Sequence, residues 1–190
     1  MTDKAPRLQR KEKEDLPASW QPAYEHVQET RNSRPLANVF ATLANSPRGL
    51  EAVAAVGEYV RFHSSFEDQL RELTILTVAQ DISCAYEWTH HYHIAEKFGV
   101  PADKLKAIGT PKIEQEPAPL GPTLKFARLV GANQEVDDQT YDALKKHMGE
   151  EGITELTVMV GYYGMLGRFI NTTRVPLEKG TEPVPFSNPR

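Results

Sequence analysis

Apolar residues recur at helical spacing along most of the chain, with interruptions where prolines gather. Within residues 67–81 (EDQLRELTILTVAQD), Leu70, Leu73, Leu76 and Ala79 follow one another at intervals of three. The inner run LTILTV could also form a buried strand, but the length of the segment and its polar flanks favour a helix. No segment alternates apolar and polar residues over a full strand length, so the pattern predicts an all-α protein.

Proline, serine and glycine predict where the helices begin and end. Ser46-Pro47 divides residues 36–62 into two helices, because serine favours the N-cap and proline the first helical turn. Ser83 is expected to cap a helix over residues 84–98, which stops at Gly99. Further helices are expected at 102–108, 120–132, 137–149 and 153–171, with a proline-rich loop at 109–122.

The length of 190 residues suits one domain flanked by tails. We expect the domain at residues 34–178 and a short C-terminal tail at 179–190. Residues 1–33 are rich in charges of alternating sign and contain prolines, so they are interpreted as a mobile, solvated tail, with a partner-binding arm as the alternative.

Two stretches of the chain resemble each other. Residues 71–80 (RELTILTVAQ) and 154–163 (TELTVMVGYY) share Glu-Leu-Thr at an offset of 83 residues, which indicates an internal duplication into two helical units. On that offset the first unit alone keeps reactive side chains. Cys84, Glu87 and His91 would correspond to Gly167, Ile170 and Arg174.

Composition and charge exclude several classes of function. A net charge of −4 without a basic cluster argues against binding nucleic acid, since phosphate contacts need concentrated Lys and Arg. No apolar run approaches the ~20 residues of a membrane span, and no signal-peptide pattern opens the chain, so no membrane association and a cytoplasmic location are expected. Cys84 is the single cysteine, so no intrachain disulfide can form.

The segment 84–93 (CAYEWTHHYH) holds the densest set of reactive side chains. Glu87 and His91 lie four residues apart and therefore share a helix face, where the carboxylate can orient the imidazole. Cys84 precedes Glu87 by one turn. Glu72 lies among leucines of the preceding helix, where a carboxyl group is either paired or has a raised pKa, and both states are useful in proton transfer.

Each of these residues also has a purely structural interpretation. Glu87 and His91 could be an ordinary solvated pair on a helix surface. Cys84 could be an inert packed residue, although a helix N-terminus lowers a thiol pKa and would make it reactive. The histidines of H-H-x-H could suggest a metal, but they cannot all point one way from a helix, and no metal site is expected.

Residues 70–99 (LRELTILTVAQDISCAYEWTHHYHIAEKFG) resemble the signature of the carboxymuconolactone decarboxylase family, within the alkylhydroperoxidase D-like superfamily. In its peroxidase branch a Glu is followed by Cys-x-His-Cys and a further His on the same helix. Glu72, Cys84 and His91 match that Glu, the first Cys and the last His. Tyr86 and Glu87 stand where the branch has His and the second Cys. The resemblance implies an alkylhydroperoxidase D-like helical bundle.

The missing second thiol points to the decarboxylase-like branch, because a dithiol peroxidase needs a second cysteine to resolve the first. The resemblance therefore implies a lyase or isomerase acting on a small carboxylated lactone or unsaturated acid from aromatic-compound catabolism. A one-cysteine hydroperoxide reductase using Cys84 with an external thiol, and a non-catalytic oligomeric binding protein, remain alternatives.

A carboxylated unsaturated lactone carries its own electron sink, so no cofactor is expected. We expect His91, oriented by Glu87, to act as general acid–base and Glu72 to be a second proton carrier. Tyr86, His90 and Arg71 are candidates for binding the substrate carboxylate.

The resemblance also implies a homo-oligomer, from dimer to hexamer. Large apolar side chains that subunit contacts could cover are Phe40, Tyr59, Phe62, Phe66 and Trp88.

Overall fold

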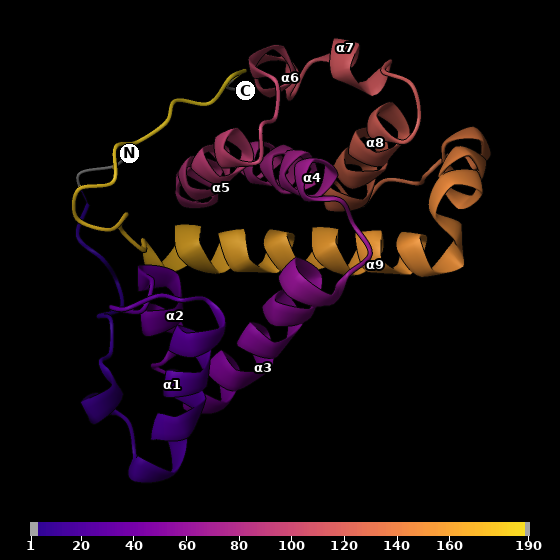
Figure 1. Ribbon diagram of the computed structural model, residues 1–190. Helices are drawn as coiled ribbons and strands as arrows, with labels where there is room; N and C mark the ends of the chain where they lie inside the picture. Colours follow the sequence, from indigo (N-terminus) through magenta and orange to yellow (C-terminus); the bar gives the residue numbers. More distant parts are fainter. Residues whose placement is uncertain (1–3, 189–190) are drawn as a thin grey trace. The chain divides into compact units, whose positions relative to one another are not determined.

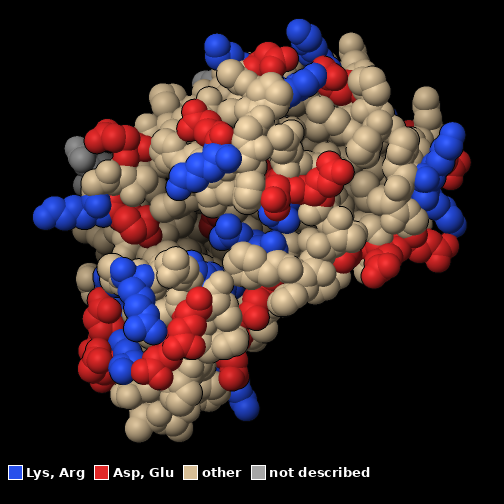
Figure 2. All heavy atoms as spheres, viewed as in Figure 1, with Lys and Arg blue, Asp and Glu red and all other residues tan. Residues whose placement is uncertain are grey.

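The computed structural model describes residues 4–188, and helices and turns account for all the regular structure in that range (Figure 1). The predicted all-α class is confirmed. No helix in the described range is long and apolar enough to cross a membrane. On the face shown in Figure 2, positive and negative side chains are interspersed.

The chain divides into two compact units, which are described separately. Unit 1 comprises described residues up to His63 together with 169–181. Its helices are α1 (Gln21–Thr30), α2 (Asn38–Leu43), α3 (Pro47–Glu58), a short π-helix η3 (Tyr59–His63) and two 3-10 turns, η1 (Lys13–Asp15) and η2 (Ala18–Trp20).

Unit 2 comprises residues 64–168 and the described residues from Glu182 onward. Its helices are α4 (Asp68–Asp81), α5 (Ala85–Lys97), α6 (Ala102–Ala107), α7 (Pro111–Glu114), α8 (Leu120–Gly131) and most of α9 (Asp138–Thr173). The division into two units differs from the single domain predicted at residues 34–178.

The predicted mobile N-terminal tail is wrong for much of residues 4–33. Tyr24 and Val27, three positions apart on α1, are each only 1 % exposed. The backbone of Lys11 donates to the carbonyl of Ala41 (2.8 Å) and accepts from the Tyr24 hydroxyl (3.0 Å). The many charges around them hid this short apolar pair from a composition-based interpretation. Residues 1–3 of the predicted tail lie outside the described range.

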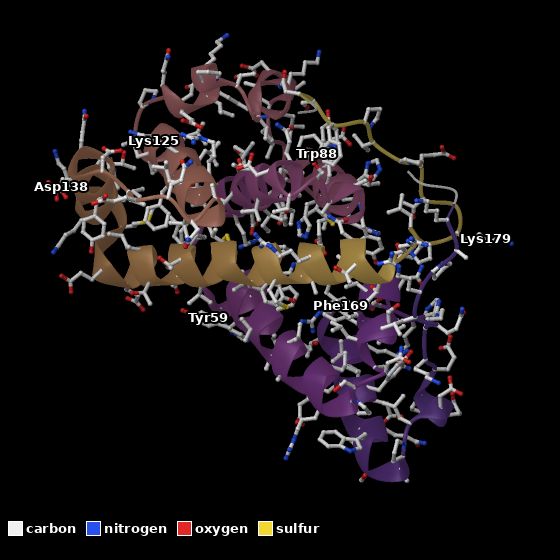
Figure 3. All side chains as sticks on the ribbon, turned by 180° about the vertical axis from the view of Figure 1, so that it is seen from behind. Tyr59, Trp88, Lys125, Asp138, Phe169 and Lys179 are labelled. Atoms are coloured by element: carbon white, nitrogen blue, oxygen red, sulfur yellow. The ribbon has the colours of Figure 1, made fainter. Side chains whose placement is uncertain are left out.

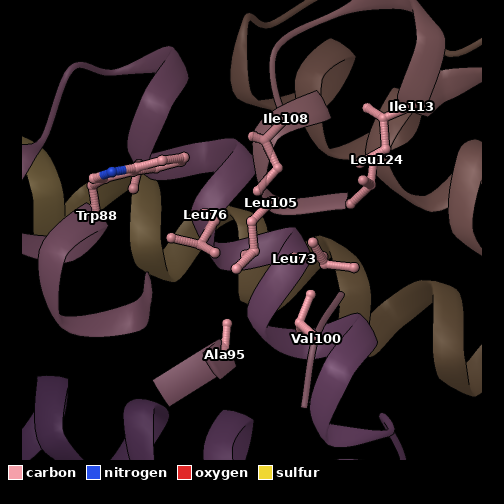
Figure 4. Packing of buried hydrophobic residues seen from close by; sticks show 10 residues of the cluster. Leu73, Leu76, Trp88, Ala95, Val100, Leu105, Ile108, Ile113 and Leu124 are labelled. Atoms are coloured by element: carbon pink, nitrogen blue, oxygen red, sulfur yellow. The ribbon is translucent and has the colours of Figure 1, made fainter. Parts of the chain in front are cut away.

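Helix α4 lies at the centre of unit 2, and every residue from Arg71 to Gln80 is buried. It packs beside α5, and side chains from α4, α5, α6, α7 and α8 form the apolar core around Leu76 and Leu105 (Figure 4). Burial on all sides explains why LTILTV could be mistaken for a core strand.

The predicted C-terminal tail is also packed where the structure describes it. The backbone of Val184 donates to Thr89 Oγ1 (3.2 Å), and the indole N–H of Trp88 donates to the carbonyl of Pro185 (3.1 Å). Phe186 packs against Trp88 with ring centroids 5.3 Å apart and the ring planes tilted by 45°. We call residues 182–188 the C-terminal strap. The last two residues of the chain lie outside the described range.

Most predicted helix ends are confirmed. Ser46 caps α3 by accepting from the backbone of Gly49 (3.3 Å), and Gly99 follows α5 with a φ of 74°. The expected cap at Ser83 is wrong, because Ser83 adopts a φ of 53° and Cys84 is the N-cap. The loop predicted at 109–122 contains the short α7. Gly149, with φ 66° and ψ −170°, breaks α9 where two helices were predicted.

Each copy of the predicted repeat covers part of a single helix. Residues 71–80 lie in α4 and 154–163 in α9, so both stretches are helical. The chain leaves α4 at Ile82, whereas α9 continues helically through Gly167, the position that corresponds to Cys84.

The large apolar residues expected at subunit contacts separate into two groups. Phe40, Phe66 and Trp88 are buried within the chain itself, whereas Tyr59 and Phe62 are 38 % and 48 % exposed. Only the second pair remains available for a contact with another chain.

Candidate functional site

His91 lies between two carboxylates inside unit 2. Its Nδ1 is 2.6 Å from Oε2 of Glu72 on α4, and its Nε2 is 3.3 Å from Oε2 of Glu87, one turn earlier on α5. Helices α4 and α5 lie side by side, which brings residues 19 positions apart into contact (Figure 1). The structure thus joins Glu72, Glu87 and His91, and we call these three residues the relay.

The three side chains of the relay are buried. Glu72 is 0 % exposed, and Glu87 and His91 are each 4 % exposed. Burial by itself would lower the pKa of His91, but the charges of Glu72 and Glu87 and their hydrogen bonds outweigh it, so the pKa is raised above its usual 6.5. The interpretation of Glu87 and His91 as a solvated surface pair is therefore wrong.

Arg71 lies beside the relay. Its Nε is 3.7 Å from Oε1 of Glu72, and neither atom has a hydrogen-bond partner among the described residues. The rest of the guanidinium is engaged, because Nη1 donates to the carbonyl of Phe66 (3.3 Å) and Nη2 pairs with Asp68. The structure therefore places Arg71 as a buried cation next to Glu72, not as an open group awaiting a substrate carboxylate.

Cys84 is the N-cap of α5 and is fully buried. Burial, followed by the charge of Glu87, raises the pKa of the Cys84 thiol to about 12. Backbone hydrogen bonds from Tyr86 and Glu87 act in the opposite direction but do not compensate. Of the two interpretations left open by the sequence, the inert packed residue fits this environment, because desolvation outweighs the effect of the helix N-terminus.

The other predicted site residues lie around α5 without converging on one point. Tyr86 is buried and its ring lies 4.4 Å from that of His90, centroid to centroid. His93 faces outward beside Glu96, at 3.4 Å. His90, His91 and His93 therefore diverge, and among residues 4–188 no group of three or more His, Cys, Asp or Glu side chains could hold a metal ion.

Two residues of α9 complete the surroundings of the site and were missed from the sequence. The ring of Tyr163 meets the His91 ring edge-on at 5.1 Å. Gly167 lies so close to α5 that a Cβ there would be 3.2 Å from the Cβ of Cys84 and 2.3 Å from Ile82 Cδ1. Both residues lie within or just after the second copy of the repeat, and that repeat was the sequence signal that could have pointed to them.

Part of the chain matches a known family. Residues 47–112 match the model of the carboxymuconolactone decarboxylase family. The matched range contains Glu72, Cys84, Glu87 and His91. A comparison with curated proteins gave no match.

Solved structures share the fold. A protein from Ralstonia eutropha JMP134, described as an alkylhydroperoxidase AhpD core and an uncharacterized peroxidase-related protein, has a TM-score of 0.76 and 21% identity, covering 96% of this chain and 100% of its own. An uncharacterized peroxidase-related protein from Silicibacter sp. TM1040 has a TM-score of 0.75 and 20% identity, covering 95% of this chain and 97% of its own.

The debrominase Bmp8 also shares the fold. Its structure, a cysteine-to-alanine variant in complex with 2,3,4-tribromopyrrole, has a TM-score of 0.66 and 17% identity, covering 94% of each chain. At these identities the similarity establishes the alkylhydroperoxidase D-like fold that was predicted.

Proposed function

Since residues 47–112 match the model of the carboxymuconolactone decarboxylase family, we propose that this protein is a cofactor-free enzyme that moves protons on a small carboxylated lactone or related unsaturated acid. The observation that carries the proposal is the position of His91, which has a buried carboxylate at each ring nitrogen. Such an imidazole can accept a proton on one nitrogen and release one from the other.

Decarboxylation needs little else from the protein. When the bond between the ring carbon and the carboxylate breaks, its electron pair passes into the conjugated lactone carbonyl and CO₂ leaves. The resulting dienolate then takes one proton on carbon, so the net change is loss of CO₂ and gain of one proton. A positioned acid–base group contributes about 10²–10⁴-fold to such a step.

Glu87 is the member of the relay that exchanges the proton with substrate in this proposal. Both nitrogens of His91 already face carboxylates, and Glu72 is 0 % exposed. Glu87 ends the relay on the side away from Glu72. From the sequence, these roles were assigned the other way round: His91 was expected to exchange the proton with the substrate, and Glu87 was expected to orient His91.

The same groups would also move a double bond. For an isomerisation, Glu87 would take a proton from one carbon of the substrate and return it to another, with no net change in protons. Lyase and isomerase activity therefore make the same demands on the relay. They differ in whether CO₂ is released.

Thiol chemistry is the weaker alternative. A hydroperoxide reductase would use the Cys84 thiolate, but the pKa of about 12 keeps the thiol protonated at neutral pH. Cys84 is also the only cysteine, so an external thiol would have to resolve the oxidised form. The cysteine variant of debrominase Bmp8 in complex with tribromopyrrole makes dehalogenation of a small ring a related alternative, and it would need the same thiolate.

The test is a substrate screen with matched variants. Small carboxylated lactones and unsaturated di- and tricarboxylic acids carrying a labelled carboxyl group are incubated with the protein, and NMR follows release of labelled CO₂ and deuterium uptake from heavy water. His91→Asn and Glu87→Gln should lower turnover by about 10²–10⁴-fold, whereas His93→Asn and Glu96→Gln, which alter the exposed His–Glu pair on the same helix, should leave it nearly unchanged.

The same screen separates the alternatives. Activity that survives Glu87→Gln and is lost in Cys84→Ser, with peroxides or halogenated rings as substrates, would replace the relay proposal with thiol chemistry. Unchanged turnover in both relay variants would refute the relay, and turnover of no compound in any panel would favour a non-catalytic binding protein.

A further inference from the structure

Arg71 reaches the relay through its Nε atom, which lies 3.7 Å from Oε1 of Glu72. Arg71 is 7 % exposed and Glu72 is 0 % exposed, and neither of these two atoms has a hydrogen-bond partner among the described residues. The other carboxylate oxygen of Glu72, Oε2, lies 2.6 Å from Nδ1 of His91. Glu72 therefore has a cation beside one oxygen and the imidazole beside the other.

The proton that Glu72 and His91 share can rest on either residue. With the proton on Nδ1, Glu72 is a carboxylate that accepts a hydrogen bond from the ring. With the proton on Glu72, the carboxylic acid donates to a bare Nδ1, and the neutral imidazole keeps its own proton on Nε2. The short contact between the two atoms permits both arrangements, so the surrounding charges decide between them.

Burial by itself favours the arrangement with fewer charges, since ionised groups lose their hydration inside a protein. Arg71 opposes that preference, because its positive charge stabilises the carboxylate form of Glu72 at a site that water does not screen. Asp68 offsets part of this charge at Nη2 of Arg71, but the Asp68 side chain is 53 % exposed, so water screens its effect on Glu72.

The other groups around His91 do not hold the proton on Nδ1. Glu87 lies 3.3 Å from Nε2 and favours a proton on that nitrogen instead. Tyr163 on α9 contributes an edge-on aromatic contact rather than a charge. The Cys84 thiol stays protonated, because burial raises its pKa to about 12. Arg71 is thus the cation that the described residues place within ion-pair distance of Glu72.

We propose that Arg71 is a positioning residue of the relay, which keeps Glu72 ionised and the shared proton on Nδ1 of His91. Nε2 is then the nitrogen that gains and loses a proton, and it faces Glu87, the residue that exchanges the proton with substrate in the proposed function. Arg71 acts through Glu72. This role in turnover rests on the proposed function, whereas the position of the proton can be measured without a substrate.

The test is ¹⁵N NMR on the full chain with labelled histidine, without substrate and at about pH 6, where a histidine with a raised pKa is protonated. Protonated and bare ring nitrogens give well-separated ¹⁵N resonances, and the signals that disappear in His91→Asn identify His91. Nδ1 of His91 should be protonated in the parent protein. In Arg71→Gln its resonance should move about half of the way or further towards that of a bare nitrogen, as for two arrangements of similar free energy.

Arg71→Lys separates the charge of Arg71 from its shape, because it keeps a cation beside Glu72 and gives up the planar guanidinium. Nδ1 should stay protonated in this variant. Arg128→Gln, which breaks an ion pair between α7 and α8, and Lys125→Gln, which removes a cation of α8 (Figure 3), are the controls and should leave the Nδ1 resonance in place. Circular dichroism checks that each variant is folded, and Arg71→Met, with an uncharged side chain of similar length, replaces Arg71→Gln if that variant does not fold.

Three results would overturn the proposal. They are a bare Nδ1 in the parent protein, an unmoved Nδ1 resonance in the uncharged variant of Arg71, and an equal displacement in that variant and in Arg71→Lys, which would make the role of Arg71 one of shape. None of these results involves turnover, so they leave the proposed function to the substrate screen. A screen that finds no substrate would, conversely, leave the measured position of the proton unchanged.

Discussion

The Nδ1 atom of His91 and the Oε2 atom of Glu72 lie 2.6 Å apart, although the residues belong to different helices of unit 2. Glu72 contacts Arg71 on its other side, at 3.7 Å, and His91 contacts Glu87, at 3.3 Å. These four ionisable side chains therefore form one buried row in which basic and acidic groups alternate. Removal of His91 would leave Glu87 buried without its partner in this row, and removal of Glu87 would leave His91 with Glu72 alone.

The first prediction concerns the relay itself. His91→Asn and Glu87→Gln should lower kcat by about 10²–10⁴-fold, because each removes a proton carrier while keeping a polar side chain of similar size. Steady-state kinetics on the substrate found by the screen measures the effect. His93→Asn and Glu96→Gln should stay within about twofold of the parent, since that pair is exposed and contributes little.

The second prediction follows from the raised pKa of His91. A group whose pKa is higher in the folded than in the unfolded chain stabilises the fold most below its unfolded pKa, and that contribution is lost as pH rises through the folded pKa. The destabilisation caused by His91→Gln should therefore be larger at about pH 6 than at about pH 9. Urea unfolding of both proteins at the two pH values measures it, and a difference that grows with pH would contradict the raised pKa.

The third prediction concerns Cys84. A thiol with a pKa of about 12, against an ordinary 9.0, has a thiolate population about a thousandfold lower at neutral pH. Alkylation by iodoacetamide should be slow in the folded protein and faster in Glu87→Gln, because the charge of Glu87 helps to raise the pKa. Mass spectrometry over time follows the reaction, and rapid labelling of the folded parent at neutral pH would contradict the prediction.

The fourth prediction uses two glycines of α9 as a matched pair. Gly167→Ala should destabilise the protein by about 1–3 kcal/mol, because the new methyl group would press on Cys84 and Ile82. Gly161→Ala has no atom within 4 Å of the added carbon and should stabilise it by about 0.5–1 kcal/mol through helix propensity. Chemical unfolding measures both free energies. Equal effects of the two substitutions would mean that α9 does not press on Cys84.

The fifth prediction concerns the C-terminal strap. Phe186→Ala removes the ring that packs at a tilt against Trp88. The substitution should lower the free energy of unfolding by about 1–2 kcal/mol, less than for a fully buried phenylalanine, since Phe186 is only partly buried. In a Trp20→Phe background the emission of Trp88 should shift to longer wavelength as water reaches the indole. Phe62→Ala, at a side chain that is 48 % exposed, is the control and should leave both the stability and the emission nearly unchanged.

The parts of the fold and site that the sequence predicted are those that depend on local spacing. The Glu87–His91 pair follows from a four-residue interval, and the cap at Ser46 and the stop at Gly99 follow from local backbone preferences. The family resemblance brought Glu72 into the site, because its spacing from Cys84 matched the pattern.

What escaped prediction depends on contacts between distant segments. The bond from Glu72 to His91 needs α4 and α5 to pack side by side, and spacing along the chain does not fix that packing. The packing of Cys84 likewise involves Gly167, more than eighty residues away, so local spacing left open whether the thiol is inert or reactive. The segments that contain Tyr24 and the C-terminal strap were predicted to be tails because charged residues and prolines surround them. In the structure, contacts with distant parts of the chain hold both segments in place.

The complete burial of Glu72 gives the proposed proton path a single entrance. A proton that reaches Glu72 must come and go past His91, since no surface of Glu72 meets water. An isomerisation would return to the substrate the same hydrogen that it removed, so isotope transfer within one molecule should exceed exchange with solvent. A decarboxylation consumes one proton in each cycle. Because the bound substrate would block the path from water to the relay, the relay would have to be protonated before the substrate binds.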